Sequence, residues 1–218
     1  MKFEESFRSP LDIRQGTDCH WVSPMILENK LPHEVFAELS NVKKGSNYVD
    51  KLVGVFPDQH QIDLNDCPIF TSHCLNLSDV FAEKHGRSPV FTEIRQNVPP
   101  SNVYVKDLWI NEMYAGSYNK LHRHDGLLSF IIFMDIPYTL EDQLEHENYI
   151  DKPEKVLNGC TEFLDPYSQA FHTYNVHKGV EGIMLLFPSW IYHVVYPFKG
   201  TDKPRVSLAG NIAFDYRY

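Results

Sequence analysis

The sequence predicts a mainly β protein with flanking helices, organised as a single domain over residues 1–218. From about residue 101 onward, short runs of β-branched and aromatic residues alternate with turn-forming Pro, Gly, Asn and Asp, a pattern typical of a sandwich or barrel. Before that point, apolar residues recur at helical spacing. We therefore expect a helical or mixed N-terminal layer over about residues 1–100, packed on a β-sandwich core over about residues 101–218.

Two helices are predicted in the N-terminal layer. The first begins near Pro32, because proline is favoured at a helix start, and Val35, Phe36 and Leu39 follow at helical spacing. The second covers part of 69–84, with Gly86 as its stop signal. The polar stretch 57–65 between them has no strong periodicity.

Strands are expected where apolar and β-branched residues cluster, at 103–105, 108–110, 127–133, 182–187 and 206–214. An acidic, polar insertion at 138–158 separates two of them. It is compatible with an exposed loop or short helix, and also with a lid over a functional site, since long ordered insertions in compact domains are often functional.

Composition excludes several classes of partner. The net charge of −9 argues against a nucleic acid or an anionic membrane surface, because either would favour a basic face. The apolar runs are too short to span a bilayer, and the N-terminus is acidic where a signal peptide needs an apolar stretch. We therefore expect a cytoplasmic protein, whose four cysteines are reduced thiols.

Three histidines are the candidate metal ligands. His122 and His124 stand two residues apart before an apolar strand, so alternation places both side chains on one face. His193 lies near the end of a later apolar strand. If the two strands face each other across a sandwich, the third imidazole closes a site with open positions for a substrate or O₂.

Arg205 and Ser207 are the candidate anion ligands. They alternate on one face of a strand, while Val206 and Leu208 point the other way. An arginine fork beside a hydroxyl suits a carboxylate, which the guanidinium can bind through two hydrogen bonds. This segment follows His193 and could run beside its strand. A solvated edge arginine or a structural ion pair is the alternative.

Four pieces of sequence, in order, resemble a family of 2-oxoglutarate and Fe(II)-dependent oxygenases found in bacteria and tailed phages. They are Gly116-x-Tyr118-Asn119-x-x-His122-x-His124 with Leu128-Ser129, then Leu186-Phe187-Pro188-Ser189-Trp190-x-x-His193-x-Val195, Arg205-x-Ser207 and Asn211. The resemblance covers roughly residues 108–214. It implies a double-stranded β-helix, or jelly roll, with the metal at one end.

The resemblance also implies roles for individual residues. His122 and His193 would be the first and last ligands of Fe(II), and Arg205 and Ser207 would bind the far carboxylate of 2-oxoglutarate. Tyr114 is a further candidate for that carboxylate. The wider superfamily has a carboxylate where this chain has His124. We expect His124 as the middle ligand, with the adjacent Asp125 or an open position as alternatives.

The leading hypothesis is therefore a 2-oxoglutarate-dependent dioxygenase of the hydroxylase type, which uses Fe(II) and O₂ on an unidentified small-molecule or protein substrate. The same residues also resemble the cupins, which share the jelly roll and include three-histidine dioxygenases and isomerases without 2-oxoglutarate. A non-catalytic jelly roll used for binding is the third possibility. The pair Arg205 and Ser207 favours the oxygenase.

Overall fold

The computed structural model describes residues 18–46, 54–55, 58–85, 103–145, 157–166 and 168–215. Its helices are α1 (His33–Ser40), α2 (Pro68–His85) and α4 (Leu140–Glu145), with short 3₁₀ helices at Leu64–Asp66 and Lys178–Val180. Its strands are β1 (Asp18–Ser23), β2 (Ile26–Lys30), β3 (Gly54–Val55), β4 (Asp58–Gln61), β5 (Val103–Met113), β6 (Tyr118–His122), β7 (Leu128–Asp135), β8 (Thr161–Leu164), β9 (Phe171–Tyr174), β10 (Ile183–Pro188), β11 (Tyr192–Val195) and β12 (Arg205–Phe214).

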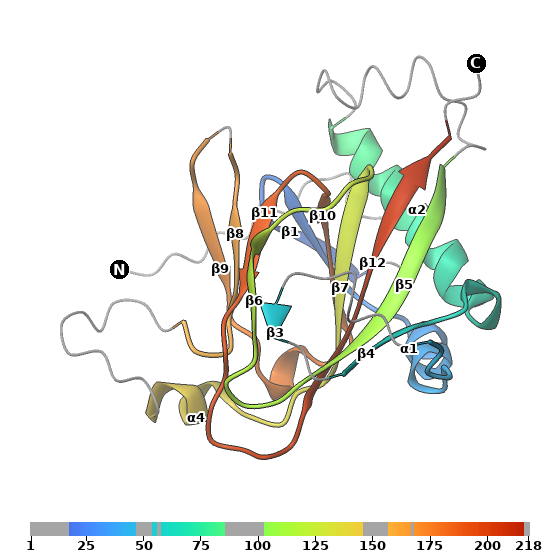
Figure 1. The fold of residues 1–218 in the computed structure, drawn as a ribbon. Coiled ribbons are helices and arrows are strands. Elements are labelled where there is room, and N and C mark those ends of the chain that lie inside the picture. Colours follow the sequence, from blue (N-terminus) through green and yellow to red (C-terminus); the bar gives the residue numbers. More distant parts are fainter. Residues whose placement is uncertain are drawn as a thin grey trace.

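The described strands form two antiparallel sheets that face each other as a jelly roll (Figure 1). The larger sheet has the order β1-β2-β10-β7-β12-β5-β4, and the smaller has the order β3-β6-β11-β8-β9. The predicted mainly β fold, with its jelly-roll architecture, is confirmed. The two strands expected at 103–105 and 108–110 are one continuous strand, β5.

Both expected N-terminal helices are present, and α1 and α2 cover the outer face of the large sheet (Figure 1). The Glu38 carboxylate on α1 accepts hydrogen bonds from the backbone N–H groups of Ile69 (3.0 Å) and Phe70 (2.6 Å), at the start of α2. These donors have no partner within their own helix, so Glu38 satisfies them and joins the two helices.

The N-terminal half also supplies strands that its sequence did not predict. β1 and β2 extend one edge of the large sheet and β4 forms the other, pairing with β5 through Gln59 opposite Asn111. β4 falls within the polar stretch 57–65. Gly86, the expected stop signal, lies outside the described residues, as does most of the insertion 138–158. The first part of the insertion forms α4.

Strand β7 shows how the core is divided. Its residues are buried on both faces: Phe130 and Ile132 pack under the helices, whereas Ile131 and Phe133 point between the two sheets. A strand covered on both sides has a continuous apolar sequence, as in 127–133.

Within the described part of the chain, no helix has the length and apolar character needed to cross a bilayer.

Candidate metal and co-substrate site

Strands β6 and β11 bring His122 and His193 together. These strands pair directly in the small sheet, with His193 opposite His122. The histidines are therefore neighbours within one sheet and do not meet across the sandwich, which is the arrangement that was considered from the sequence. The register then shifts, because Val195 lies opposite Asn119: two steps along β11 match three along β6. This one-residue bulge redirects side chains on β6.

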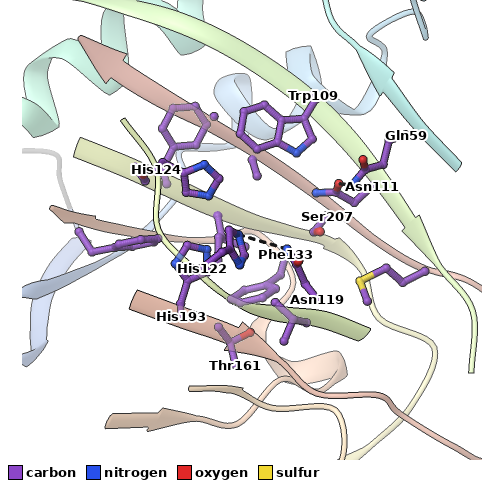
Figure 2. Close-up of a pocket in the computed structure, with 18 of the residues that line it drawn as sticks. Gln59, Trp109, Asn111, Asn119, His122, His124, Phe133, Thr161, His193 and Ser207 are labelled. Atoms are coloured by element: carbon purple, nitrogen blue, oxygen red, sulfur yellow. Dashed lines mark hydrogen bonds between the residues drawn. The ribbon is translucent and has the colours of Figure 1, made fainter. Parts of the chain in front are cut away.

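His122, His124 and His193 converge on one point (Figure 2). Their candidate ligand nitrogens all lie within 4.8 Å of one another. The ring centroids of His122 and His193 are 4.2 Å apart, and that of His124 lies 4.9 Å from His122 and 5.2 Å from His193. His193 is buried, and the other two are half-buried. Such a spacing allows three imidazoles to reach a single ion.

Backbone carbonyls orient two of the rings. Nδ1 of His122 lies 2.6 Å from the carbonyl oxygen of Lys120, and Nδ1 of His193 lies 3.4 Å from that of Ile191. A carbonyl oxygen only accepts, so each Nδ1 carries the proton and each Nε2 keeps its lone pair. Both rings thus present Nε2 to a metal, and the carbonyls fix their orientation.

His124 lies just beyond β6 and is held by a buried polar network. Its backbone N–H donates to the carbonyl oxygen of Ser189 (3.0 Å). The Ser189 hydroxyl lies 2.9 Å from that of Ser129, which in turn donates to the Asn211 side-chain oxygen (2.8 Å). The network links strands β7 and β12 and the turn after β10 to the loop that carries His124. Asp125 is exposed and lies outside the histidine group.

All three imidazoles are held neutral. Burial lowers the pKa of His122, and it lowers that of His193 well below the ordinary value, with the neighbouring histidines adding to the effect. Burial, followed by the charge of His122, lowers the pKa of His124 to about 4. Neutral imidazoles keep the lone pairs that a metal needs at neutral pH.

The lowered pKa of His124 predicts a pH-dependent stability for the metal-free protein. Above pH ~6.5 this histidine is neutral in both the folded and unfolded chain and contributes no pH dependence. As the pH falls towards 4, the unfolded chain takes up a proton that the folded protein does not, so the free energy of unfolding falls. Urea unfolding from pH 7.5 to 4.5 with a chelator present should show this loss of unfolding free energy. The His124→Gln variant has no such group to titrate, so its unfolding free energy should fall less, by a difference of up to about 1.4 kcal/mol per pH unit. Equal losses in the two proteins would contradict the assignment.

Arg205 and Ser207 enter the site from the opposite sheet. β12 does not run beside the strand of His193, as the sequence allowed, but lies between β7 and β5 in the large sheet. Arg205 is 3% exposed. Its Nη1 donates to the Tyr138 hydroxyl (3.0 Å) and to the Gly159 carbonyl oxygen (2.8 Å), and its Nη2 contacts the Met113 sulfur at 3.3 Å.

No carboxylate among the described residues forms an ion pair with Arg205. The guanidinium is thus neither a solvated edge arginine nor part of an ion pair within the described structure. Its partners among the described residues are neutral groups, so none of these residues compensates its positive charge. Burying an unpaired charge is costly, so this position favours an anionic ligand.

One cavity, of about 50 Å³, contains both groups of residues. The three histidines and Ser207 line it (Figure 2), and so does Arg205. Tyr114 does not line the cavity and is 43% exposed, at the turn after β5. The structure therefore brings together five of the six candidate residues.

The cavity wall also contains polar residues that sequence reasoning missed. They are Gln59, Asn111, Asn119 and Thr161, from four different strands, and Trp109 packs its ring 5.8 Å from that of His124. Asn111 could have been found, since it alternates with Trp109 and Met113 along one face of β5. Asn119 could not, because regular alternation places it on the face opposite His122.

The donor set fits a transition metal. Three neutral imidazole nitrogens in the wall of one cavity suit Fe(II), and a site with three protein ligands leaves coordination positions open. Arg205, which lines the same cavity, suits a small carboxylate. Fold and site together define a jelly-roll metal centre with an adjoining anion site.

Comparison with known proteins identifies the family. Residues 107–211 match the family described as 2OG-Fe(II) oxygenase, so this part of the chain is a 2-oxoglutarate and Fe(II)-dependent oxygenase domain. Its cofactors are Fe(II) and 2-oxoglutarate, and it acts as a dioxygenase. The matched segment runs from β5 to β12 and contains every cavity residue named above except Gln59.

Solved structures share the fold at low sequence identity. A prolyl-4-hydroxylase from Pseudomonas putida superposes with a TM-score of 0.54 at 12% identity, covering 88% of this chain and 93% of that one. The viral collagen prolyl hydroxylase of Paramecium bursaria Chlorella virus-1 has a TM-score of 0.45 at 12% identity, covering 86% and 95%. The first likeness supports the jelly-roll fold. No curated protein sequence matches.

Proposed function

We propose that this chain is a hydroxylase in which His122, His124 and His193 hold Fe(II), while Arg205 and Ser207 hold the far carboxylate of 2-oxoglutarate. The observation that carries the proposal is the buried Arg205, which has no acidic partner among the described residues and lines the same cavity as the histidines. A dianion anchored there compensates the charge and extends from Arg205 towards the metal.

The protein's contribution is to bind and orient. Tyr138 and the Gly159 carbonyl fix Nη1 of Arg205, and Nη2 contacts the Met113 sulfur. The N–H groups that these partners leave would donate to the ligand. Ser207 stands two residues along the same inward face of β12 and adds a hydroxyl. Ile131, Phe133 and Phe187 form the apolar part of the cavity wall and exclude water.

Bound Fe(II) supplies the redox chemistry: with O₂, 2-oxoglutarate is converted to succinate and CO₂, and a substrate C–H becomes C–OH. The residues around the metal keep the three imidazoles neutral and oriented throughout. We further propose that the whole chain, residues 1–218, acts as one domain, since the N-terminal strands complete the sheet that carries β12.

Turnover of 2-oxoglutarate to succinate tests the proposal. We expect succinate formation that requires Fe(II), is supported by ascorbate, and is abolished by a chelator. Calorimetry on the Mn(II)-loaded protein measures 2-oxoglutarate binding independently of any substrate. Absence of both succinate and binding would refute the proposal. Activity that persists without 2-oxoglutarate would instead favour a cupin-like enzyme.

A further inference from the structure

Asn119 is a buried polar residue beside the proposed metal ligands, and the proposed chemistry leaves it unused. It is 9% exposed and lines the cavity from β6. The bulge between β6 and β11 turns it to the same side as His122, and its Nδ2 lies 3.2 Å from Nε2 of His122 (Figure 2). Bulges near active sites commonly redirect side chains in this way.

The tautomer of His122 fixes the orientation of the Asn119 carboxamide. Because Nδ1 of His122 donates to the Lys120 carbonyl, its Nε2 only accepts, and Asn119 must direct its NH₂ group towards it. The oxygen Oδ1 therefore points elsewhere. It is buried and has no hydrogen-bond partner among the described residues. A buried carbonyl without a donor costs about 1–3 kcal/mol, so its retention indicates a ligand.

Neither cofactor can satisfy both ends of this carboxamide. When Nε2 of His122 coordinates a metal, its lone pair no longer accepts from Asn119, so the NH₂ group also loses its partner. At neutral pH 2-oxoglutarate carries acceptors and no donors, so it cannot pair with Oδ1. The Gln59 oxygen is a second buried acceptor of the cavity wall without a partner in the part of the chain that the structure describes. A hydrogen-bond donor must come from another molecule.

We infer that Asn119 recognises a carboxamide or peptide group of the primary substrate. One N–H of that group donates to Oδ1 of Asn119, and its carbonyl accepts from Nδ2. This pairing satisfies both ends of Asn119 and places the amide next to the histidine group. The inference deepens the proposed function and rests on it, because it takes the histidines as ligands of a metal. Asn119 is thus a substrate-binding residue that determines specificity.

Proton relaxation of small probes tests the inference without the natural substrate. The full chain is saturated with Mn(II) and 2-oxoglutarate, and the paramagnetic relaxation of the methyl protons of acetamide and acetone is measured by NMR. The two probes have similar shape, but only acetamide has N–H donors. We expect acetamide to bind about tenfold more strongly than acetone, as one or two net hydrogen bonds allow.

The Asn119→Leu variant replaces the carboxamide by an apolar group of similar size and should abolish the preference for acetamide. Thr161→Val, which removes a hydroxyl from the same wall, should keep it. Saturating Mn(II) offsets any change in metal affinity, and thermal unfolding checks that the variants fold. Equal relaxation by both probes in wild type, or a preference that survives in Asn119→Leu, would overturn the inference.

The proposed function is monitored in the same samples. Relaxation of the 2-oxoglutarate methylene protons reports whether the co-substrate binds near Mn(II). If these protons do not relax while acetamide is still preferred, the co-substrate assignment fails and Asn119 remains a recognition residue. If the methylene protons relax but the protein does not prefer acetamide to acetone, the co-substrate assignment stands and the inference about Asn119 fails.

Discussion

Replacing Arg205 with methionine should lower the affinity for 2-oxoglutarate by about 30- to 4000-fold, because truncating one partner of a buried charge pair typically costs about 2–5 kcal/mol. The guanidinium is 3% exposed and has no carboxylate partner among the described residues, so its charge is available to the ligand. Calorimetry on the Mn(II)-loaded protein measures the change directly.

The stability of the same variant separates a ligand-binding arginine from a structural one. Methionine is apolar and similar in length, so it fills the space between Phe198 and Met113 without burying a charge. We expect the free energy of unfolding in the absence of 2-oxoglutarate to change by no more than about 1–2 kcal/mol, the cost of leaving the Tyr138 and Gly159 groups without a donor. The Arg205→Lys variant keeps the positive charge but loses the forked guanidinium. Its affinity for 2-oxoglutarate should therefore lie between those of wild type and Arg205→Met. A large loss of stability with unchanged 2-oxoglutarate affinity would make Arg205 structural.

Much of the site could be predicted from the sequence because its residues stand in local patterns. His122 precedes a buried strand, His193 follows one, and Arg205 alternates with Ser207. Each pattern identifies a face of a segment and a chemical preference. The jelly roll followed from the resemblance of those patterns to a known family, whereas strand periodicity alone gave only a sandwich or barrel.

The spatial relation between those segments could not be predicted. Nothing local shows that the strands of His122 and His193 pair side by side while β12 lies in the opposite sheet, because pairing partners are set by long-range packing. The strand β4 was missed for the same reason. It is polar, and its place at the sheet edge depends on Gln59 meeting Asn111. The bulge that turns Asn119 inward likewise exists only in the paired strands.

Held by three histidines, as proposed, the metal centre would be less negative than a site with a carboxylate ligand. Three neutral imidazoles would leave the full charge of Fe(II) in the cavity, and Arg205, which lines the same cavity, would add another positive charge. A dianionic co-substrate would thus be matched at both ends. The electrostatic consequence is that its binding should depend strongly on the loaded metal, since one of its two anchors is the metal itself.

Replacing His193 with alanine should lower Mn(II) and Fe(II) affinity by more than about 100-fold, because loss of a ligand exceeds the 10- to 100-fold cost of losing a group that merely supports one. His193 is 3% exposed and its Nε2 is directed at the other two rings, so no other described side chain can take its place.

The middle position, occupied by His124, should behave differently. In His124→Asp a carboxylate replaces the imidazole and restores the two-histidine, one-carboxylate set, so this variant should keep metal, whereas His124→Ala should lose it. Asp125→Asn is the matched control, because Asp125 is exposed and adjacent and lies outside the histidine group. Metal content after dialysis, together with calorimetric titration, ranks the variants. If Asp125→Asn loses metal and His124→Ala does not, the middle ligand is the carboxylate. If all four variants retain metal as wild type does, the ion is not bound by these histidines.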